Sequence, residues 1–165
     1  MAYSIDGDGH LDLSPCYRGF GCDLMLASQI SHEFFYSELQ DLVAWDGLEV
    51  RGMRSEAKWR HLVCKHGHDS EPMNPITSLE LGRVRTLPVL KRAVSGSINV
   101  DVYSQTGRRG GDDRVELVVD GVDKDYLVSL GFFGDHYVLR SAYPAGSKYV
   151  EETRERGVLV SRIRV

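Results

Sequence analysis

Residues 56–69, EAKWRHLVCKHGHD, concentrate groups that can transfer protons or bind phosphate. On a helix that turns about 100° per residue, one side of this segment is basic, and Trp59 and Val63 lie on the opposite side. The basic side consists of Arg54, Lys58, His61 and Lys65. Because histidine ordinarily titrates near neutral pH, it can both accept and donate a proton. The pattern predicts an amphipathic helix that presents His61 beside phosphate-binding cations, or else a basic stripe that only faces solvent.

A second segment with polar groups lies late in the chain, where YVLRSAYPAG occupies residues 137–146. Successive side chains of a strand point to opposite faces, which predicts Ser141 and Tyr143 on one face and Arg140 and Ala142 on the other. A strand with one polar face explains this pattern by itself. The segment becomes a candidate site only if the basic helix borders the end of this strand.

Other polar residues have competing explanations. Cys64, His66 and His68 are close in sequence, but no CxxC or HxxxH pair accompanies them and a fourth zinc ligand is missing, so we predict no metal. His136 follows GFFGD and is either a second acid–base partner or a turn residue. Three arginines in and beside an expected hairpin loop either reach a phosphate backbone or, more simply, face solvent: Arg108, Arg109 and Arg114.

The elements that must position these residues differ between the two halves of the chain. In the first half, the spacing of apolar residues and the helix start and stop signals predict three helices. The first covers about residues 28–46, capped by Ser28 or Ser31, and the second covers 56–66 and is closed by Gly67. The third runs over residues 76–94, where Pro88 produces a kink or a break.

From Ser95 onward, short runs of β-branched and aromatic residues alternate with Gly/Asp turns. These runs predict strands at 98–103, 114–122, 126–133 and 136–143, followed by a helix at 147–156 and a last strand at 158–165. We therefore expect an α+β fold, with N-terminal helices packed on a C-terminal antiparallel sheet of four or five strands. Residues 1–50 would form an N-terminal extension with one amphipathic helix, and residues 51–165 the main domain.

Composition limits the class of protein. The chain has 165 residues, a net charge of −4 and three cysteines, an odd number that fits free thiols in a reducing compartment. The sequence has neither an apolar stretch of membrane-spanning length nor a secretory signal, so we expect a cytoplasmic protein, including one delivered into a target cell, with no membrane partner. The negative charge argues against non-specific coating of nucleic acid, but it is compatible with a local basic cleft.

The helix W-x-H-hydrophobic-x-x-K-H, the following Leu-Pro break and the strand ending in SAYP occur together over residues 54–160. This combination resembles the phage- and toxin-associated branch of the barnase–EndoU–colicin–RelE nuclease superfamily, whose members carry a helical W..HI..RH motif and a terminal V-T-A-Y-P strand. The chain departs from that pattern: KHGHD stands in place of RHPE, and Ser141 replaces the usual threonine. Residues 1–50 match no part of the pattern.

The resemblance implies a metal-independent endoribonuclease without a cofactor, in which the ribose 2′-hydroxyl attacks the adjacent phosphate. His61 would act as base or acid, and Arg54 and Lys65 would hold the phosphate. Ser141 would donate a hydrogen bond to a phosphate oxygen, and Tyr143 would stack on a base or contact the ribose. The remaining candidates for contacting substrate are Lys58, His66, Arg140 and His136. The expected partners are RNA and a cognate inhibitor or immunity protein.

Two alternatives stay open. His66 lies on the side of Trp59, which favours a structural role, but it would be the better acid–base residue if the cleft lay at the edge of the helix. The chain could also be a non-enzymatic binding module or inhibitor whose N-terminal helix docks a protein partner through its aromatic residues. Those residues are Phe34, Phe35, Tyr36 and Trp45, although core packing explains them equally well. An enzyme should bring His61, Lys65 and Ser141 into one cleft, whereas a binding module has no reason to do so.

Overall fold

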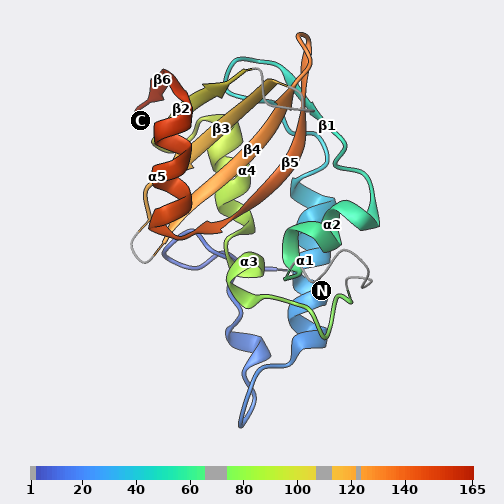
Figure 1. The fold of residues 1–165 in the computed structure, drawn as a ribbon. Helices are drawn as coiled ribbons and strands as arrows, with labels where there is room; N and C mark the ends of the chain where they lie inside the picture. The colour runs from blue at the N-terminus through green and yellow to red at the C-terminus, as the bar shows by residue number, and fades with distance from the viewer. Residues whose placement is uncertain (1–2, 66–73, 107–112, 122–123) are drawn as a thin grey trace. The chain divides into compact units, whose positions relative to one another are not determined.

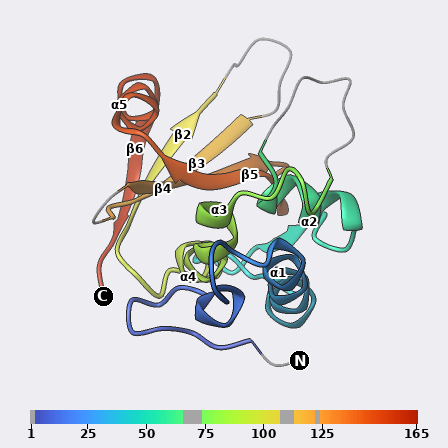
Figure 2. The same ribbon diagram turned by 90° about the horizontal axis from the view of Figure 1, so that it is seen from below.

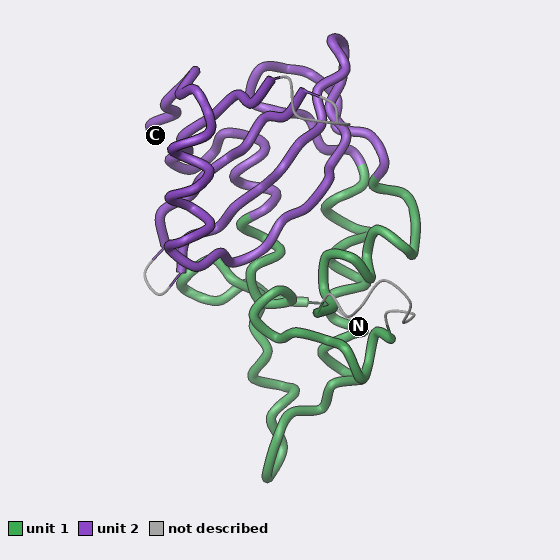
Figure 3. Tube along the Cα trace, in the orientation of Figure 1, with its two compact units in different colours: residues 1–40, 53–89 green, residues 41–52, 90–165 purple. Residues whose placement is uncertain are grey.

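The computed structural model describes residues 3–65, 74–106, 113–121 and 124–165. The chain folds into two compact units, each built from two separate stretches of sequence (Figure 3). Unit 1 comprises residues 1–40 and 53–89, and unit 2 comprises residues 41–52 and 90–165. Residue 50, where the sequence suggests a domain boundary, lies within residues 41–52, which belong to unit 2.

Unit 1 is helical. It contains the short 3-10 helix η1 (Ser14–Cys16), α1 (Leu24–Glu38), α2 (Glu56–Val63), α3 (Leu81–Arg85) and the start of α4 (Leu87–Ser95). The α1 helix begins where the Asp23 carboxylate accepts a hydrogen bond from the Leu26 N–H at 3.1 Å. The expected caps, Ser28 and Ser31, are instead buried inside the helix. Ser31 accepts a hydrogen bond from the Trp59 indole N–H at 3.0 Å, which ties α1 to α2.

The first helix ends at Glu38, so its expected extension to residue 46 is wrong. Residues 42–50 instead turn back on themselves, with backbone hydrogen bonds from Ala44 N to Leu48 O at 2.8 Å and from Val50 N to Leu42 O at 3.0 Å. Gly47 makes this turn possible because its φ is +86°, a conformation that disfavours other residues. The returning segment becomes strand β1 (Glu49–Arg51) of unit 2.

The second helix starts at the Ser55 cap as its sequence suggests, but it ends at Val63 rather than at residue 66. Cys64 has an extended backbone and forms an isolated β-bridge with Leu79. The Lys65 N–H continues this pairing with a hydrogen bond of 2.7 Å to Ser78 O. Pairing with residues 78–80 therefore replaces the last expected helical turn.

The third expected helix is broken into two, α3 and α4, at Thr86. Pro88 lies in the first turn of α4, where a missing backbone N–H costs no intrahelical hydrogen bond. The expected break is therefore confirmed, while the expected start at residue 76 is wrong because α3 begins at Leu81.

Unit 2 is built on a six-stranded sheet in the order β1-β5-β4-β3-β2-β6. Its other strands are β2 (Val100–Gln105), β3 (Asp113–Val119), β4 (Asp125–Phe132), β5 (His136–Ala145) and β6 (Val158–Ile163). Strands β2 to β5 are antiparallel neighbours and β6 is antiparallel to β2, whereas β1 is parallel to β5. The α+β class is confirmed. The expected four- or five-stranded antiparallel sheet is wrong, because β1 comes from a segment to which the sequence pattern assigned no strand.

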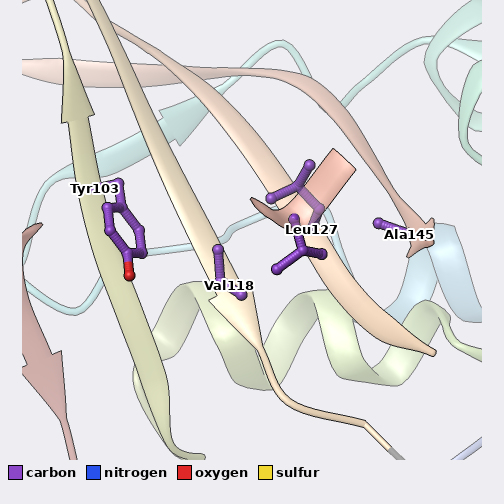
Figure 4. Packing of buried hydrophobic residues seen from close by; sticks show 5 residues of the cluster. Tyr103, Val118, Leu127 and Ala145 are labelled. Carbon is purple, nitrogen blue, oxygen red and sulfur yellow. The ribbon is translucent and has the colours of Figure 1, made fainter. Parts of the chain in front are cut away.

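Different helices cover the two faces of the sheet. Helix α5 (Ser147–Arg156) lies over one face, and residues 90–95 of α4 lie on the other (Figures 1 and 2). Under α5, adjacent strands contribute one buried side chain each to a small apolar cluster (Figure 4). The cluster consists of Tyr103, Val118, Leu127 and Ala145 from β2 to β5 together with Val150 from α5. This packing leaves the rest of the same face for polar residues.

Candidate functional site

A row of polar side chains crosses the sheet beside the apolar cluster. The strand register places Glu116 opposite Ser129, and Ser129 opposite Ser141. Gln105 and Arg114 are opposite each other one pleat further along the same face. Together with Tyr143 and side chains of α5, these residues line a cavity of about 270 Å³, which we call the sheet–α5 cleft.

The floor of the cleft is a hydrogen-bonded chain of three side chains. The Ser129 hydroxyl donates to Glu116 Oε1 at 2.9 Å, and Arg114 Nη1 donates to Ser129 Oγ at 3.3 Å. The Arg114 Nε is buried and has no hydrogen-bond partner in the part of the chain that the structure describes. A buried guanidinium N–H without an acceptor is uncommon in proteins, and an anionic oxygen is its strongest acceptor. The cleft therefore combines a buried carboxylate with a cation that has donor capacity to spare.

The α5 helix supplies the other wall of the cleft with Tyr149, Glu152 and Arg156. Its position is fixed by Arg154, whose Nη1 donates to Asp101 Oδ2 at 3.0 Å and to the Tyr103 hydroxyl at 2.7 Å. Asp101 also accepts a hydrogen bond from Arg164 Nη2 at 2.7 Å. Burial opposes ionisation of Asp101, but the hydrogen bonds from Arg164 and Arg154 outweigh it and hold its pKa below the usual range.

A second group of polar and aromatic side chains lies where β4 turns into β5. His136 Nδ1 and Asp135 Oδ1 are 2.6 Å apart, and this hydrogen bond lowers the pKa of Asp135. The Phe133 ring, which is 44% exposed, stacks on the His136 ring with centroids 5.2 Å apart. The Arg140 guanidinium lies 5.6 Å from the centroid of the same Phe133 ring. Exposed rings and guanidinium planes of this kind are the surfaces on which nucleobases stack.

The candidate residues of β5 occupy different environments. Ser141 and Tyr143 both line the sheet–α5 cleft, in agreement with the period-two alternation of the sequence. Arg140 does not share the buried environment of Ala142, as the alternation suggested, but is partly exposed. The reason is an irregularity in the pairing of β5 with β4: Ser141 pairs with Ser129 and Leu139 with Leu130, so Arg140 is an extra residue.

The candidate residues of the basic helix belong to unit 1, and they do not all lie on a helix. Lys58 and His61 are half-buried residues of α2. Arg54 precedes the Ser55 cap, and Lys65 follows the end of the helix, so the helical wheel is wrong for both. His66 and His68 lie outside the described residues. Ser141 belongs to unit 2, so the convergence of His61 and Lys65 with Ser141 stays a prediction.

Several residues of the cleft were missed by the sequence reading. Arg114, for which the sequence leaves open a solvated loop or a contact with a phosphate backbone, is a partly buried residue of β3, whereas Arg108 and Arg109 lie outside the described residues. Glu116 is only 5% exposed, and its signal in the sequence is a single carboxylate within the apolar strand RVELVV. Arg156 is the exposed last residue of α5. A charged residue inside an apolar strand, two positions from an arginine, would have indicated this site.

The aromatic residues proposed as a docking surface pack mainly inside the units. Phe34 and Phe35 are 3% and 0% exposed, as the core-packing explanation requires. The Tyr36 hydroxyl, which is on the surface, donates to Glu56 Oε1 at 2.8 Å. Trp45 is not part of the helix but belongs to unit 2, where it stacks on Tyr137 with centroids 5.4 Å apart.

Within the described residues, no three His, Cys, Asp or Glu side chains are arranged to hold a metal ion. No described helix combines the length and the apolar character needed to cross a membrane. No known protein family, curated protein or solved structure matches the chain. The strand order and the lining of the cleft define the class of protein: an α+β protein with a polar, arginine-containing cleft on one face of its sheet.

Proposed function

We propose that the protein is a metal-independent endoribonuclease that cleaves RNA through attack of the ribose 2′-hydroxyl on the adjacent phosphate. The observation that carries this proposal is the joint presence of Glu116, Arg114 and Ser141 in one cleft, with a buried guanidinium N–H that lacks an acceptor. RNA cleavage of this kind needs a base for the 2′-hydroxyl, an acid for the leaving 5′-oxygen and donors for the developing charge on phosphate.

Two of the three requirements, the base and the hydrogen-bond donors, have candidates in unit 2. Glu116 would take the proton of the 2′-hydroxyl as the new O–P bond forms. Arg114 and Ser141 would donate hydrogen bonds to the non-bridging phosphate oxygens, and Tyr143 would contact the base or the ribose. The P–O5′ bond then breaks to leave a 2′,3′-cyclic phosphate.

The leaving 5′-oxygen needs a proton, and a histidine is the natural donor near neutral pH. His61 is our first candidate and His66 is the second. His136 is five residues from Ser141 along β5, roughly 16 Å away, which is too far to protonate the same leaving oxygen. In this scheme Lys58, Lys65 and Arg54 would contribute positive charge toward the RNA. Single-alanine variants of the two histidines distinguish these roles.

The experiment uses end-labelled RNA incubated with the purified chain in EDTA. We expect fragments that end in a 2′,3′-cyclic phosphate, and no cleavage of an RNA that carries a single 2′-deoxynucleotide at the cleaved position. Glu116→Gln preserves the side-chain shape and should lower the rate by roughly 10²–10⁴-fold. Glu151→Gln is the matched control because Glu151 is an exposed residue of α5 that does not line the cleft.

Two results would contradict the proposal. One is cleavage that requires a divalent cation. The other is RNA binding without cleavage by the parent chain and by all variants, which would favour the binding-module alternative instead.

A further inference from the structure

Unit 1 contains a short loop with a cysteine at each end, CYRGFGC at residues 16–22. The Asp23 N–H donates to Cys16 O at 2.7 Å, so the backbone closes on itself where the two cysteines lie. Cys22 lies close enough to contribute to the raised pKa of the Cys16 thiol. Both thiols are free in this structure.

The loop is already closed while both thiols are free. Gly19 and Gly21 have φ angles of +76° and +103°, which residues with a Cβ rarely adopt, and they let the chain reverse within a few residues. A disulfide needs two Cβ atoms that are already close, because a backbone that must move strains the bond. Because the backbone hydrogen bond from Asp23 to Cys16 already closes the loop between the two cysteines, the disulfide requires only a small backbone movement.

We infer that Cys16 and Cys22 form an intramolecular disulfide by exchange with a glutathione-type disulfide, so that this loop is a site of reversible covalent modification. The inference concerns unit 1 and is independent of the proposed ribonuclease activity. The third cysteine, Cys64, is buried elsewhere in unit 1, with its thiol directed to Asn74 O at 3.7 Å.

The accessibility of the two thiols sets the order of the exchange. Cys22 is partly exposed, whereas Cys16 is 0% exposed. The Cys22 thiolate attacks one sulfur of the glutathione disulfide, whose S–S bond breaks to release one glutathione thiolate. The Cys16 thiolate then attacks Cys22 Sγ in the mixed disulfide and releases the second glutathione. The two cysteine thiols are oxidised, one glutathione disulfide is reduced, and the two thiol protons pass to the released thiolates.

Burial, followed by the neighbouring Cys22 and Asp23, raises the pKa of the Cys16 thiol to about 11. The thiolate is the attacking species, so the second exchange should accelerate as the pH rises from 7 to about 9. The mixed disulfide on Cys22 is therefore a detectable intermediate at the lower pH.

The test incubates the reduced full-length chain with mixtures of reduced and oxidised glutathione, stops the exchange with acid and measures intact mass and peptide linkage. We expect a product lighter than the reduced chain by two hydrogen atoms, with Cys16 linked to Cys22 and Cys64 still available for alkylation after unfolding. Cys64→Ser should behave as the parent does. Cys16→Ser should stop at the mixed disulfide on Cys22.

A comparison in urea shows whether the folded loop promotes the reaction. The quantity to compare is the ratio of intramolecular disulfide to mixed disulfide at one fixed glutathione ratio. This ratio should be at least roughly 10-fold higher for the folded chain than for the unfolded chain, because the fold holds the two thiols near each other. Equal ratios in the two states would overturn the inference. A mixed disulfide of Cys22 with glutathione that persists at every pH between about 7 and 9, with no Cys16–Cys22 disulfide, would overturn the inference as well. A disulfide that includes Cys64 would also overturn it.

Discussion

Arg114 and Arg154 are both partly buried arginines of unit 2, but their guanidinium groups have different contacts. Arg154 donates to Asp101, Tyr103 and Asp120, which is the pattern of a residue that holds two elements together. Arg114 donates to Ser129 and retains a buried Nε without a partner among the described residues. This contrast identifies Arg114 as the arginine in the cleft with the capacity to bind an anion.

Arg114→Lys tests the geometry of this donor while it keeps the positive charge. A lysine lacks the planar fork that contacts two phosphate oxygens, so RNA cleavage should slow by roughly 10–100-fold, with little change in the melting temperature. The measurement is kcat/KM on a short RNA together with thermal unfolding. Arg18→Lys, in an exposed loop of unit 1 that does not line the cleft, is the matched control. Cleavage by Arg114→Lys at the parental rate would exclude this arginine from the reaction.

His61→Ala tests whether the α2 helix takes part in the chemistry. If His61 is the acid or the base, the variant should lose roughly 10²–10⁴-fold in cleavage rate and one limb of the pH profile. Arg60→Ala, at an exposed position of the same helix, should change neither. Full activity of His61→Ala would move the role to His66, and His66→Ala should then show the loss.

At the scale of single residues, the sequence predicts where a side chain lies only if that position depends on one strand or helix alone. Alternation along one strand correctly placed Ser141 and Tyr143 on one face, because it depends on a single strand. The neighbourhood of Glu116, Ser129 and Ser141 depends on the register of three strands, and no single strand contains that information. The bulge at Arg140 likewise arises from pairing with β4.

At the scale of elements, the link between α5 and the sheet through Asp101 makes stability depend on pH. The pKa of Asp101 is lower in the folded state than in an unfolded chain, so the group stabilises the fold above its ordinary pKa. This contribution is lost as the pH falls from about 4 through the lower folded-state value. The carboxylate side chain is only 10% exposed, so solvent screens its ion pairs weakly.

Asp101→Asn should therefore lower the free energy of unfolding by about 1–3 kcal/mol at pH 7, and the difference from the parent should shrink below about pH 4. Urea unfolding at several pH values measures both effects. Asp120→Asn is the control, because that carboxylate is 83% exposed and contacts Arg154 only at 3.4 Å. Equal stability of Asp101→Asn and the parent at pH 7 would show that α5 does not depend on this contact.

The elements that the sequence predicted well are those with a strong local pattern. Strands β2 to β6 and helix α5 lie where alternation or helical spacing places them. The helix prediction for residues 39–46 is wrong, because their apolar residues also fit one side of a helix. The Asp46-Gly47 turn decides the structure of this segment, and the hydrogen bond of 2.6 Å from the Tyr137 hydroxyl to Asp46 holds it on β5. That contact joins residues far apart in sequence, so no local pattern could reveal it.

At the scale of the whole molecule, the charge distribution sets the way in which RNA can bind. The net charge is −4, yet Arg114 and Arg156 line the sheet–α5 cleft and the guanidinium of Arg140, in the middle of β5, lies over the Phe133 ring. A protein of this kind should contact few phosphates through a local site, rather than coat the nucleic acid. Binding should therefore depend only weakly on salt, because few counterions are released.

For two or three phosphate contacts, the slope of log Kd against log salt concentration should be about 1.4–2.1 on a single-stranded RNA. The measurement uses an uncleavable 2′-deoxy-substituted RNA and fluorescence anisotropy at several salt concentrations. Arg156→Gln should reduce the slope by about 0.7, the change for one lost phosphate contact, whereas Arg18→Gln in the exposed loop of unit 1 should leave it unchanged. A slope above about 5, unaffected by Arg156→Gln, would mean that RNA binds over a broad basic surface and not in the cleft.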